Sequence, residues 1–116
     1  ADLYIGKNNK QNDYVTFTLG NPKDLWFHTK DIPGSHVILP LEPNQSQEDI
    51  PEEIIYQVAS IAAYHSKGKE SQNVPVDFVP IRYVKKPSGA KPGMVIFTHN
   101  TTVYVDPKLP EGAAGK

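Results

Sequence analysis

The chain has 116 residues, a length that fits one domain with a modest hydrophobic core. It contains no cysteine, which excludes a disulfide scaffold, a thiolate metal site and a thiol nucleophile, and suits a cytoplasmic protein. The formal net charge of −1 argues against a uniformly basic nucleic-acid-binding protein. Because there is neither a long apolar run nor a charged-then-apolar leader, we expect no contact with a membrane.

The charges are segregated along the sequence. Residues 42–53 contain five acidic side chains and no basic one. Residues 67–93 contain only two acidic side chains against six basic ones, which are Lys67, Lys69, Arg82, Lys85, Lys86 and Lys91. A phosphate-bearing partner would meet this second region, although solvated loops explain any single lysine equally well.

The first element is predicted to be a β-hairpin. Residues 3–5 and 14–19 are expected to be short strands, and the polar segment between them is rich in turn-forming residues. In the second strand apolar residues alternate with polar or amphipathic ones. This alternation predicts a sheet that is covered on one side.

Two further strands are expected at residues 25–28 and 36–39. Between them, Pro33 and Gly34 suit the central positions of a type II turn, in which glycine supplies the positive φ angle. The chain would then fold back and bring His36 near His28.

Functional side chains follow a strand's period in the first of these segments. Asp24, Trp26 and His28 fall on one face of an extended chain, and Leu25 and Phe27 fall on the other. Since Leu25 and Phe27 can build the core, the face with Trp26 is a candidate binding surface. The alternative is an ordinary core tryptophan with Asp24 and His28 as its polar fasteners.

One main helix is predicted over residues 49–66. Asp49 can cap its first turn, and apolar residues recur with helical spacing, so the helix should lie against the sheet. Gly68 is a natural C-terminal stop. Lys67 and Lys69 favour the negative end of the helix, a structural reason that competes with phosphate binding.

The remaining chain predicts a strand, a loop, a hairpin and a tail. A strand over residues 76–84 is interrupted by Pro80, which indicates an edge position or a bulge. Residues 94–97 and 102–105 are expected to form a closing hairpin, and residues 107–116 a disordered tail. The fold class is therefore α+β: a single domain over residues 1–106, with an antiparallel-rich sheet packed by one main helix.

Catalytic chemistry has weak support. His28 and His36 with Asp24 and Asp31 could ligate a divalent ion, but their spacing matches no metal signature. Ser35 beside His36 lacks the strand–turn–helix context of a serine nucleophile, and no phosphate-binding P-loop is present. We therefore expect no catalytic residue, metal or cofactor, and a small histidine-dependent enzyme is the least favoured alternative.

Nucleic-acid binding needs positive charge for phosphates and flat or hydrogen-bonding groups for bases and ribose. Trp26 and the two histidines supply the second kind of group, and lysines supply the first. The candidate RNA-binding residues are Lys7, Asn8, Asp24, Trp26, His28, Lys30, Ser35, His36, Lys85, Lys86 and Lys91.

Four ordered blocks of sequence resemble a known family over nearly the whole chain. The blocks are YxGKN at residues 4–8 with ND at 12–13, DLWFH at 24–28 with PGSHV at 33–37, AAYHS at 62–66, and VKKPSGAKPGMV at 84–95. Together they resemble the NFACT-R domain, the RNA-binding module near the C-terminus of large NFACT proteins such as the bacterial RqcH proteins. The last block is most similar to Gram-positive members.

The resemblance implies a module of ribosome-associated quality control that binds rather than catalyses. Its implied partners are tRNA and the large ribosomal subunit, reached through a full-length parent that supports alanine tailing of stalled nascent chains. The rival hypothesis is an adhesin module that binds fibronectin, because Gram-positive members carry that label. Such a module could add an extended peptide to the edge strand near Pro80, and its parent would lie at the cell surface.

Overall fold

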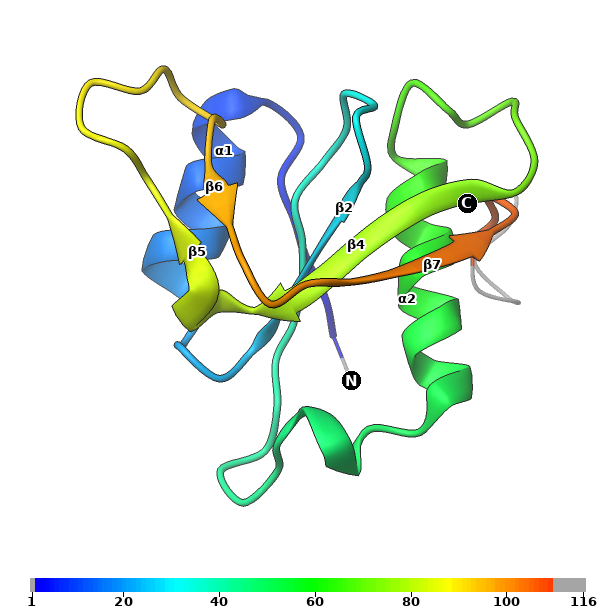
Figure 1. Cartoon of the computed structure of the whole chain (residues 1–116), viewed down its shortest axis with the longest axis horizontal. Helices are drawn as coiled ribbons and strands as arrows, with labels where there is room; N and C mark the ends of the chain where they lie inside the picture. Colours follow the sequence, from blue (N-terminus) through cyan, green and yellow to red (C-terminus); the bar gives the residue numbers. More distant parts are fainter. Residues whose placement is uncertain (1, 110–116) are drawn as a thin grey trace.

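The computed structural model describes residues 2–109 of the chain. In chain order the elements are β1 (Tyr4–Ile5), α1 (Asn9–Tyr14), the π-helix η1 (Val15–Leu19), β2 (Leu25–Thr29), β3 (Val37–Leu39), the 3-10 helix η2 (Gln47–Asp49), α2 (Glu52–Tyr64), β4 (Val74–Pro80), the 3-10 helix η3 (Ile81–Tyr83), β5 (Val84–Lys85), β6 (Ile96–Phe97) and β7 (Thr101–Val105). In Figure 1, β2 and β4 occupy the middle, with α2 on one side and α1, β5 and β6 on the other.

Five strands form one antiparallel sheet in the order β1-β3-β2-β4-β7, and β5 pairs with β6 in a separate two-stranded sheet. Trp26 of β2 lies opposite Ile38 of β3 on one side and Val79 of β4 on the other. The predicted α+β class and antiparallel sheet are confirmed.

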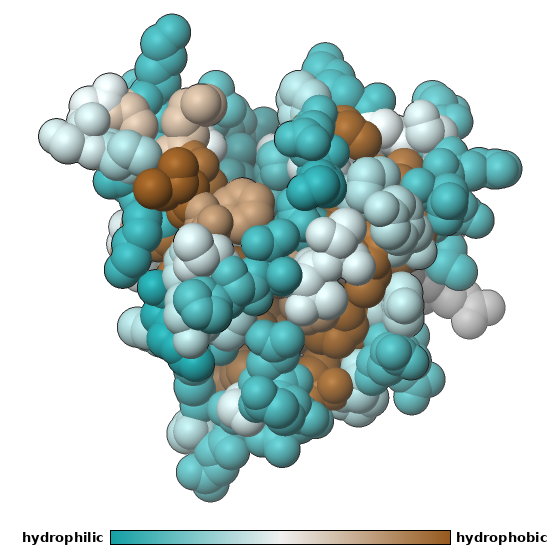
Figure 2. Space-filling model, in the orientation of Figure 1, coloured by the Kyte–Doolittle hydropathy of each residue, from teal (hydrophilic) through white to brown (hydrophobic). Residues whose placement is uncertain are grey.

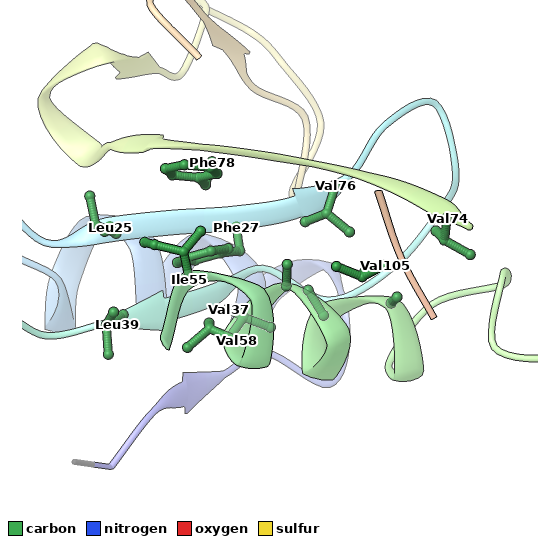
Figure 3. Packing of buried hydrophobic residues seen from close by; sticks show 13 residues of the cluster. Leu25, Phe27, Val37, Leu39, Ile55, Val58, Val74, Val76, Phe78 and Val105 are labelled. Atoms are coloured by element: carbon green, nitrogen blue, oxygen red, sulfur yellow. The ribbon is translucent and has the colours of Figure 1, made fainter. Parts of the chain in front are cut away.

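Helix α2 packs against one face of the sheet, as its apolar stripe predicted (Figure 3). Because successive strand residues point to opposite faces, Leu25 and Phe27 share the face that meets α2. The Phe27 ring stacks on that of Phe78, with centroids 5.4 Å apart. The other buried members of this core are Val37, Leu39, Ile55, Val58, Ala59, Ala62, Ala63, Val74, Val76 and Val105.

The opposite face of the sheet is buried too, which corrects the prediction of an open binding surface around Trp26. Its second apolar cluster consists of Val15, Trp26, Ile38, Val79, Ile81 and Val84. These side chains come from η1, η3 and β5 as well as from the sheet, and Phe97 of β6 packs against them. The large sheet therefore lies between two layers.

The opening segment is helical, so the predicted hairpin at residues 3–19 is wrong. Asn8 caps α1, because its side-chain oxygen accepts from the Gln11 backbone N–H at 2.9 Å. The Gln11 side chain in turn accepts from the Lys7 N–H at 2.9 Å. The first bond satisfies a donor that a helix start otherwise leaves free, and together the two bonds favour a helix start at this position.

β4 is a central strand, which overturns the predicted edge position near Pro80. It pairs with β2 on one side and with β7 on the other, and Pro80 is its last residue. The predicted closing hairpin is also wrong, because β6 pairs with β5 while β7 pairs with β4. A proline at the end of a strand removes no N–H donor that the strand pairing requires. Pro80 in the sequence therefore marked the end of β4.

The turn after β2 differs from the predicted type II geometry. Asp31 has the left-handed conformation, with φ of 56°, whereas Gly34 has no positive φ. Gly34 instead forms an antiparallel bridge with Ser66, where a Cβ on Gly34 would lie 2.7 Å from the Ser66 Cβ. The glycine is needed there for close approach of two backbones.

Helix α2 is shorter than the predicted span of 49–66. Asp49 belongs to η2, where its carboxylate accepts from the Ser46 backbone N–H at 2.9 Å. His65 is the C-cap residue, so the helix ends before Gly68 is reached. Within residues 2–109 no helix combines the length and apolarity that spanning a bilayer requires.

The C-terminal prediction falls mainly on residues 110–116, which lie outside the described residues. Just before them, the Lys108 backbone N–H donates to the Ser60 carbonyl of α2 at 3.3 Å. The domain boundary at residue 106 and the disordered tail stay predictions.

Candidate nucleic-acid interface

Three of the candidate residues form an aromatic cluster under α1 and β6. The Trp26 indole stacks on the His28 imidazole, with centroids 5.7 Å apart and 15° between the planes. The His36 ring meets both edge-on, at 5.3 Å from Trp26 and 5.5 Å from His28. The prediction that the chain folds back to bring His36 near His28 is confirmed.

Trp26 is a core tryptophan. It is only 1% exposed, and the Phe97 ring lies 4.8 Å from it, centroid to centroid. Its ring faces are occupied by protein side chains, so no base can stack on them in this conformation. Within the described residues its indole N–H is buried without a hydrogen-bond partner.

His36 is a buried, neutral connector. Its Nδ1 lies 2.9 Å from the Thr16 hydroxyl of η1, and its backbone N–H donates to Asn12 Oδ1 of α1 at 3.0 Å. Burial, with a smaller effect from the neighbouring His28, lowers the pKa of His36 to about 3. The imidazole therefore ties β3 to the helical layer and carries no charge at neutral pH.

His28 is half-buried at the edge of the same cluster. Burial lowers its pKa, and the nearby Asp77 carboxylate opposes that shift. Asp77 lies opposite His28 in the β2–β4 ladder, where its Oδ1 accepts from Asn100 at 2.9 Å and from Thr102 at 2.6 Å. These bonds fix the carboxylate, so the pair forms part of the scaffold.

Asp24 is also structural. Its side chain is 1% exposed and accepts from the Asn21 backbone N–H at 2.8 Å and from the Leu41 N–H at 2.9 Å. The carboxylate thus joins two loops at one end of the sheet. Across residues 2–109 no group of three or more histidine and carboxylate side chains is placed to hold a metal ion.

The lysine-rich loop of residues 85–93 packs against α1. Lys86 forms an ion pair with Asp13 at 3.1 Å and also donates to the Lys91 and Met94 carbonyls. Lys85 and Lys91 are exposed. Beyond the loop, Met94 and Ile96 are each 60% exposed, and apolar surface is visible over β6 at the upper left of Figure 2. Of the candidate lysines Lys85, Lys86 and Lys91, it is Lys86 whose charge is paired with another residue of the domain.

Three segments far apart in the sequence line a shallow, open polar pocket of about 370 Å³. It lies where the start of α1, the loop before β3 and the end of α2 meet. Its lining residues are Gly6, Lys7, Asn8, Asn9, Asn12, Pro33, Gly34, Ser35, Tyr64, His65, Ser66 and Lys67. No carboxylate is among them, so the lining carries net positive charge.

A third cation stands near this pocket. The Lys69 ammonium lies 4.2 Å from the centroid of the Tyr64 ring, a cation–π contact. Burial lowers the pKa of His65, and the positive charges of Lys7 and Lys69 lower it further. Both ammonium groups are therefore close enough to act electrostatically on the pocket's imidazole.

Backbone hydrogen bonds hold the pocket together. The Ser35 N–H donates to the His65 carbonyl at 2.9 Å, and the Lys67 N–H donates to the Pro33 carbonyl at 2.8 Å. These two bonds flank the bridge of Gly34. The pocket's polar side chains are consequently placed on a rigid frame.

The structure divides the candidate residues into four groups. Lys7, Asn8 and Ser35 meet at the pocket, while Lys30, Lys85 and Lys91 are exposed elsewhere on the surface. Asp24, Trp26 and His36 are buried, and His28 and Lys86 are partly buried and engaged by neighbours. RNA contact by any individual residue stays a prediction.

Sequence reasoning did not select Tyr64, His65 and Lys67 as site residues. The sequence did carry signals for them, because the AAYHS block lies in a recognisable motif and Lys67 belongs to the basic region. Periodicity places these residues at the end of a helix, but it does not predict that this end lies beside residues 6–9 in the folded chain.

The profile of the NFACT protein RNA binding domain matches residues 2–99. The chain belongs to this family. The match covers every element from β1 to β6, including the pocket and the lysine-rich loop.

Curated relatives of this NFACT RNA-binding domain include much longer proteins. The chain is 50% identical over 105 residues to the Rqc2 homolog RqcH of Bacillus subtilis, covering 90% of this chain and 17% of that protein. It is 40% identical over 107 residues to RqcH of Streptococcus pneumoniae, covering 90% and 18%. It is also 30% identical over 104 residues to mouse Coiled-coil domain-containing protein 25, covering 89% and 50%.

A solved structure has the same fold. It is the C-terminal part of the fibronectin/fibrinogen-binding protein from Streptococcus suis, which matches with a TM-score of 0.81 and 40% identity. The match covers 91% of this chain and 41% of that one.

Proposed function

We propose that this domain binds RNA, either tRNA or rRNA, as one module of a ribosome-associated quality-control factor. The parent protein would bind stalled large ribosomal subunits in the cytoplasm and support C-terminal alanine tailing of nascent chains. Within that assembly the domain binds and positions RNA and performs no catalysis.

The observation that carries the proposal is the carboxylate-free pocket with Lys7 and Lys67 in its lining, within an NFACT RNA-binding domain that is 50% identical to an RqcH protein. Lysine ammonium groups bind phosphate oxygens and release counterions from RNA, which supplies affinity without sequence preference. The chain's overall charge of −1 means that such a surface must be local, and the pocket provides that concentration.

The burial of Trp26 changes the expected mode of recognition. With this ring enclosed by His28, His36 and Phe97, binding should rest on charge and hydrogen bonds rather than on stacking at Trp26. Lys85 and Lys91 extend the basic surface along the neighbouring loop. Lys86 should contribute less, because its charge is paired with Asp13.

The test is an amide chemical-shift titration of the ¹⁵N-labelled domain with deacylated tRNA at two salt concentrations. We expect salt-sensitive shifts at residues 6–9, 33–35 and 64–67 and in the loop of residues 85–93. Replacing Lys85 and Lys91 by alanine together should weaken binding and flatten its salt dependence, whereas Lys86→Ala should do so less. Absence of saturable shifts with tRNA and with ribosomal RNA would overturn the proposal.

A second candidate function is binding of fibronectin or a peptide, since the Streptococcus suis protein with this fold bears a fibronectin/fibrinogen-binding name. The site first expected for it, an edge near Pro80, does not exist, because β4 is paired on both sides. The edge strands of the large sheet are β1 and β7. Saturable shifts along residues 101–105 with fibronectin fragments, and silence with RNA, would favour this function.

A further inference from the structure

We propose that the polar pocket between α1, the loop before β3 and the end of α2 is a specific site for one phosphate group of RNA. Lys7, Lys67, His65 and the Ser35 hydroxyl would be its ligands. The inference rests on the proposed RNA-binding function and assigns that function to a site.

The shape of the pocket suits such a ligand. Its volume of about 370 Å³ is at the small end of the range for ligand sites and exceeds what a phosphate alone requires, so the adjoining ribose can enter as well. The site is a shallow, open depression. What it adds to general electrostatic attraction is that hydrogen-bond donors from three segments meet in one place.

The charge of the pocket selects for anions. Among the twelve lining residues there are two lysines and a histidine but no aspartate or glutamate. Lys69 adds positive charge from beside Tyr64. Asp13, the carboxylate next to Asn12 in the chain, is paired with Lys86. Asp31 and Glu70 follow or precede lining residues within three positions, but both are exposed and neither is among the lining residues.

The backbone segments that line the pocket are held together without a ligand. The bridge of Gly34 with Ser66 joins the loop before β3 to the end of α2. Asn12, which is 5% exposed, joins α1 to the same loop through the His36 backbone N–H at 3.0 Å. A site whose walls are already connected loses little conformational entropy when a ligand binds.

His65 gives the site a measurable proton response. His65 lines the pocket together with Lys7 and Lys67, its ring meets the Tyr64 ring edge-on at 5.4 Å, and Lys69 lies over the Tyr64 ring. His65 also lines an apolar groove that contains Asp2, Glu42 and Lys108. A bound phosphate would offset the lysine charges that lower the pKa of His65. Binding should therefore raise that pKa and take up a proton.

The experiment uses a ribotrinucleotide with hydroxyl groups at both ends, the same trinucleotide with a 5′-phosphate, and adenosine. Internal phosphodiesters keep a constant charge between pH 5 and 8, so a change in affinity over that range is caused by titration of groups on the protein. We expect shifts at the pocket amides with at least one trinucleotide. With the trinucleotide that has hydroxyl groups at both ends, binding should be tighter at pH 6 than at pH 8, and His65→Gln should lose this pH dependence. A 5′-phosphate itself titrates at about pH 6, so the pH comparison is not made with the phosphorylated trinucleotide. Binding of both trinucleotides would indicate an internal phosphodiester, and binding of only the second would indicate a terminal phosphate.

Matched variants sharpen the result. Lys7→Ala and Lys67→Ala should each weaken trinucleotide binding about tenfold, the loss expected for one charged hydrogen bond. Lys10→Ala removes the same charge from an exposed position on α1 that does not line the pocket, and it should change affinity less than about twofold.

The outcomes separate the two proposals. Equal effects of Lys10→Ala and Lys7→Ala, or adenosine binding as tightly as the trinucleotides, would overturn the phosphate site. Salt-sensitive tRNA shifts that avoid the pocket would overturn the site and leave the RNA-binding function standing. Trinucleotide shifts at the pocket with no binding of tRNA or ribosomal RNA would support the phosphate site and overturn the RNA-binding function.

Discussion

The ammonium group of Lys86 lies 3.1 Å from the carboxylate of Asp13 and fastens the loop of residues 85–93 to α1. The other oxygen of that carboxylate accepts from the Gly93 backbone N–H at 3.0 Å. One aspartate thus binds both ends of the loop. The loop's lysines consequently have unequal roles, because Lys86 orders the segment that presents Lys85 and Lys91.

This pairing predicts a measurable coupling. Lys86→Ala, Asp13→Ala and the double variant should give a coupling free energy of about 0.5–1 kcal/mol in urea unfolding, since both side chains are partly exposed. Lys85→Ala combined with Asp13→Ala is the matched control and should be additive. Additivity of the Lys86 pair as well would show that the ion pair contributes nothing to stability.

Trp26 should be required for stability. Trp26→Ala should lower the free energy of unfolding by about 3–5 kcal/mol, because it leaves a cavity between β2 and the layer of η1 and β6. Circular dichroism is the suitable probe, since the variant lacks the only tryptophan. Trp26→Phe should fold and bind RNA as the unsubstituted domain does. A stable Trp26→Phe domain that no longer binds RNA would restore the interpretation of Trp26 as a contact residue.

His36 should make stability depend on pH. Its pKa is about 3 in the folded domain and about 6.5 in an unfolded chain, so its contribution is complete above pH 6.5. Below that pH the unfolded state binds a proton that the folded state does not, and stability should fall by about 1.4 kcal/mol per pH unit until about pH 3. His28, whose pKa is also lowered, acts in the same direction.

The corresponding measurement is urea unfolding at pH 7 and pH 5. His36 alone should account for a loss of about 2 kcal/mol between these two values. His36→Gln should have a smaller difference between the two pH values, whatever its absolute stability. Equal differences in the parent and the variant would exclude His36 as the cause.

Asp24 should affect folding rather than RNA affinity. Asp24→Ala leaves the N–H groups of Asn21 and Leu41 without their acceptor, which should cost about 3 kcal/mol in thermal or urea unfolding. Asp24→Asn retains one acceptor oxygen and should cost less. Under conditions where both variants are folded, their tRNA affinity should match that of the unsubstituted domain. A selective loss of affinity would assign Asp24 to the interface.

The sequence predicted those parts of the fold whose signals are local and periodic. The strand at residues 25–28 and the helix around residues 52–64 follow from their apolar spacing, and the antiparallel sheet follows from the short strands around them. The opening helix was missed, although Asn8 and Gln11 carry the spacing of a capping box. The β-branched and aromatic residues at 14–18 predicted a strand instead. In the folded chain Val15 packs on the far face of the sheet, whereas Tyr14 and Phe17 are exposed.

The sequence could not predict which of the candidate site residues lie together, and their contact with RNA stays a prediction. Lys7, Asn8 and Ser35 do meet at one pocket, yet Asp24, Trp26 and His36 turned out to be scaffold. Strand alternation states which residues share a face, but only tertiary structure determines whether a second layer covers that face. This layer is supplied by η1, which shortly precedes β2, and by η3 and the β5–β6 sheet, which come from residues far from β2 in the sequence.

The bridge between Gly34 and Ser66 means that the pocket is an attribute of the whole folded domain, because segments near residues 6, 34 and 66 must assemble before it exists. No excised peptide should reproduce it. A ligand that occupies the pocket must therefore raise the thermal midpoint of the entire domain in a concentration-dependent way. A variant with a weakened core should therefore regain folded domain when a ligand of the pocket is added, so occupancy of the pocket and the folded fraction of the domain rise together.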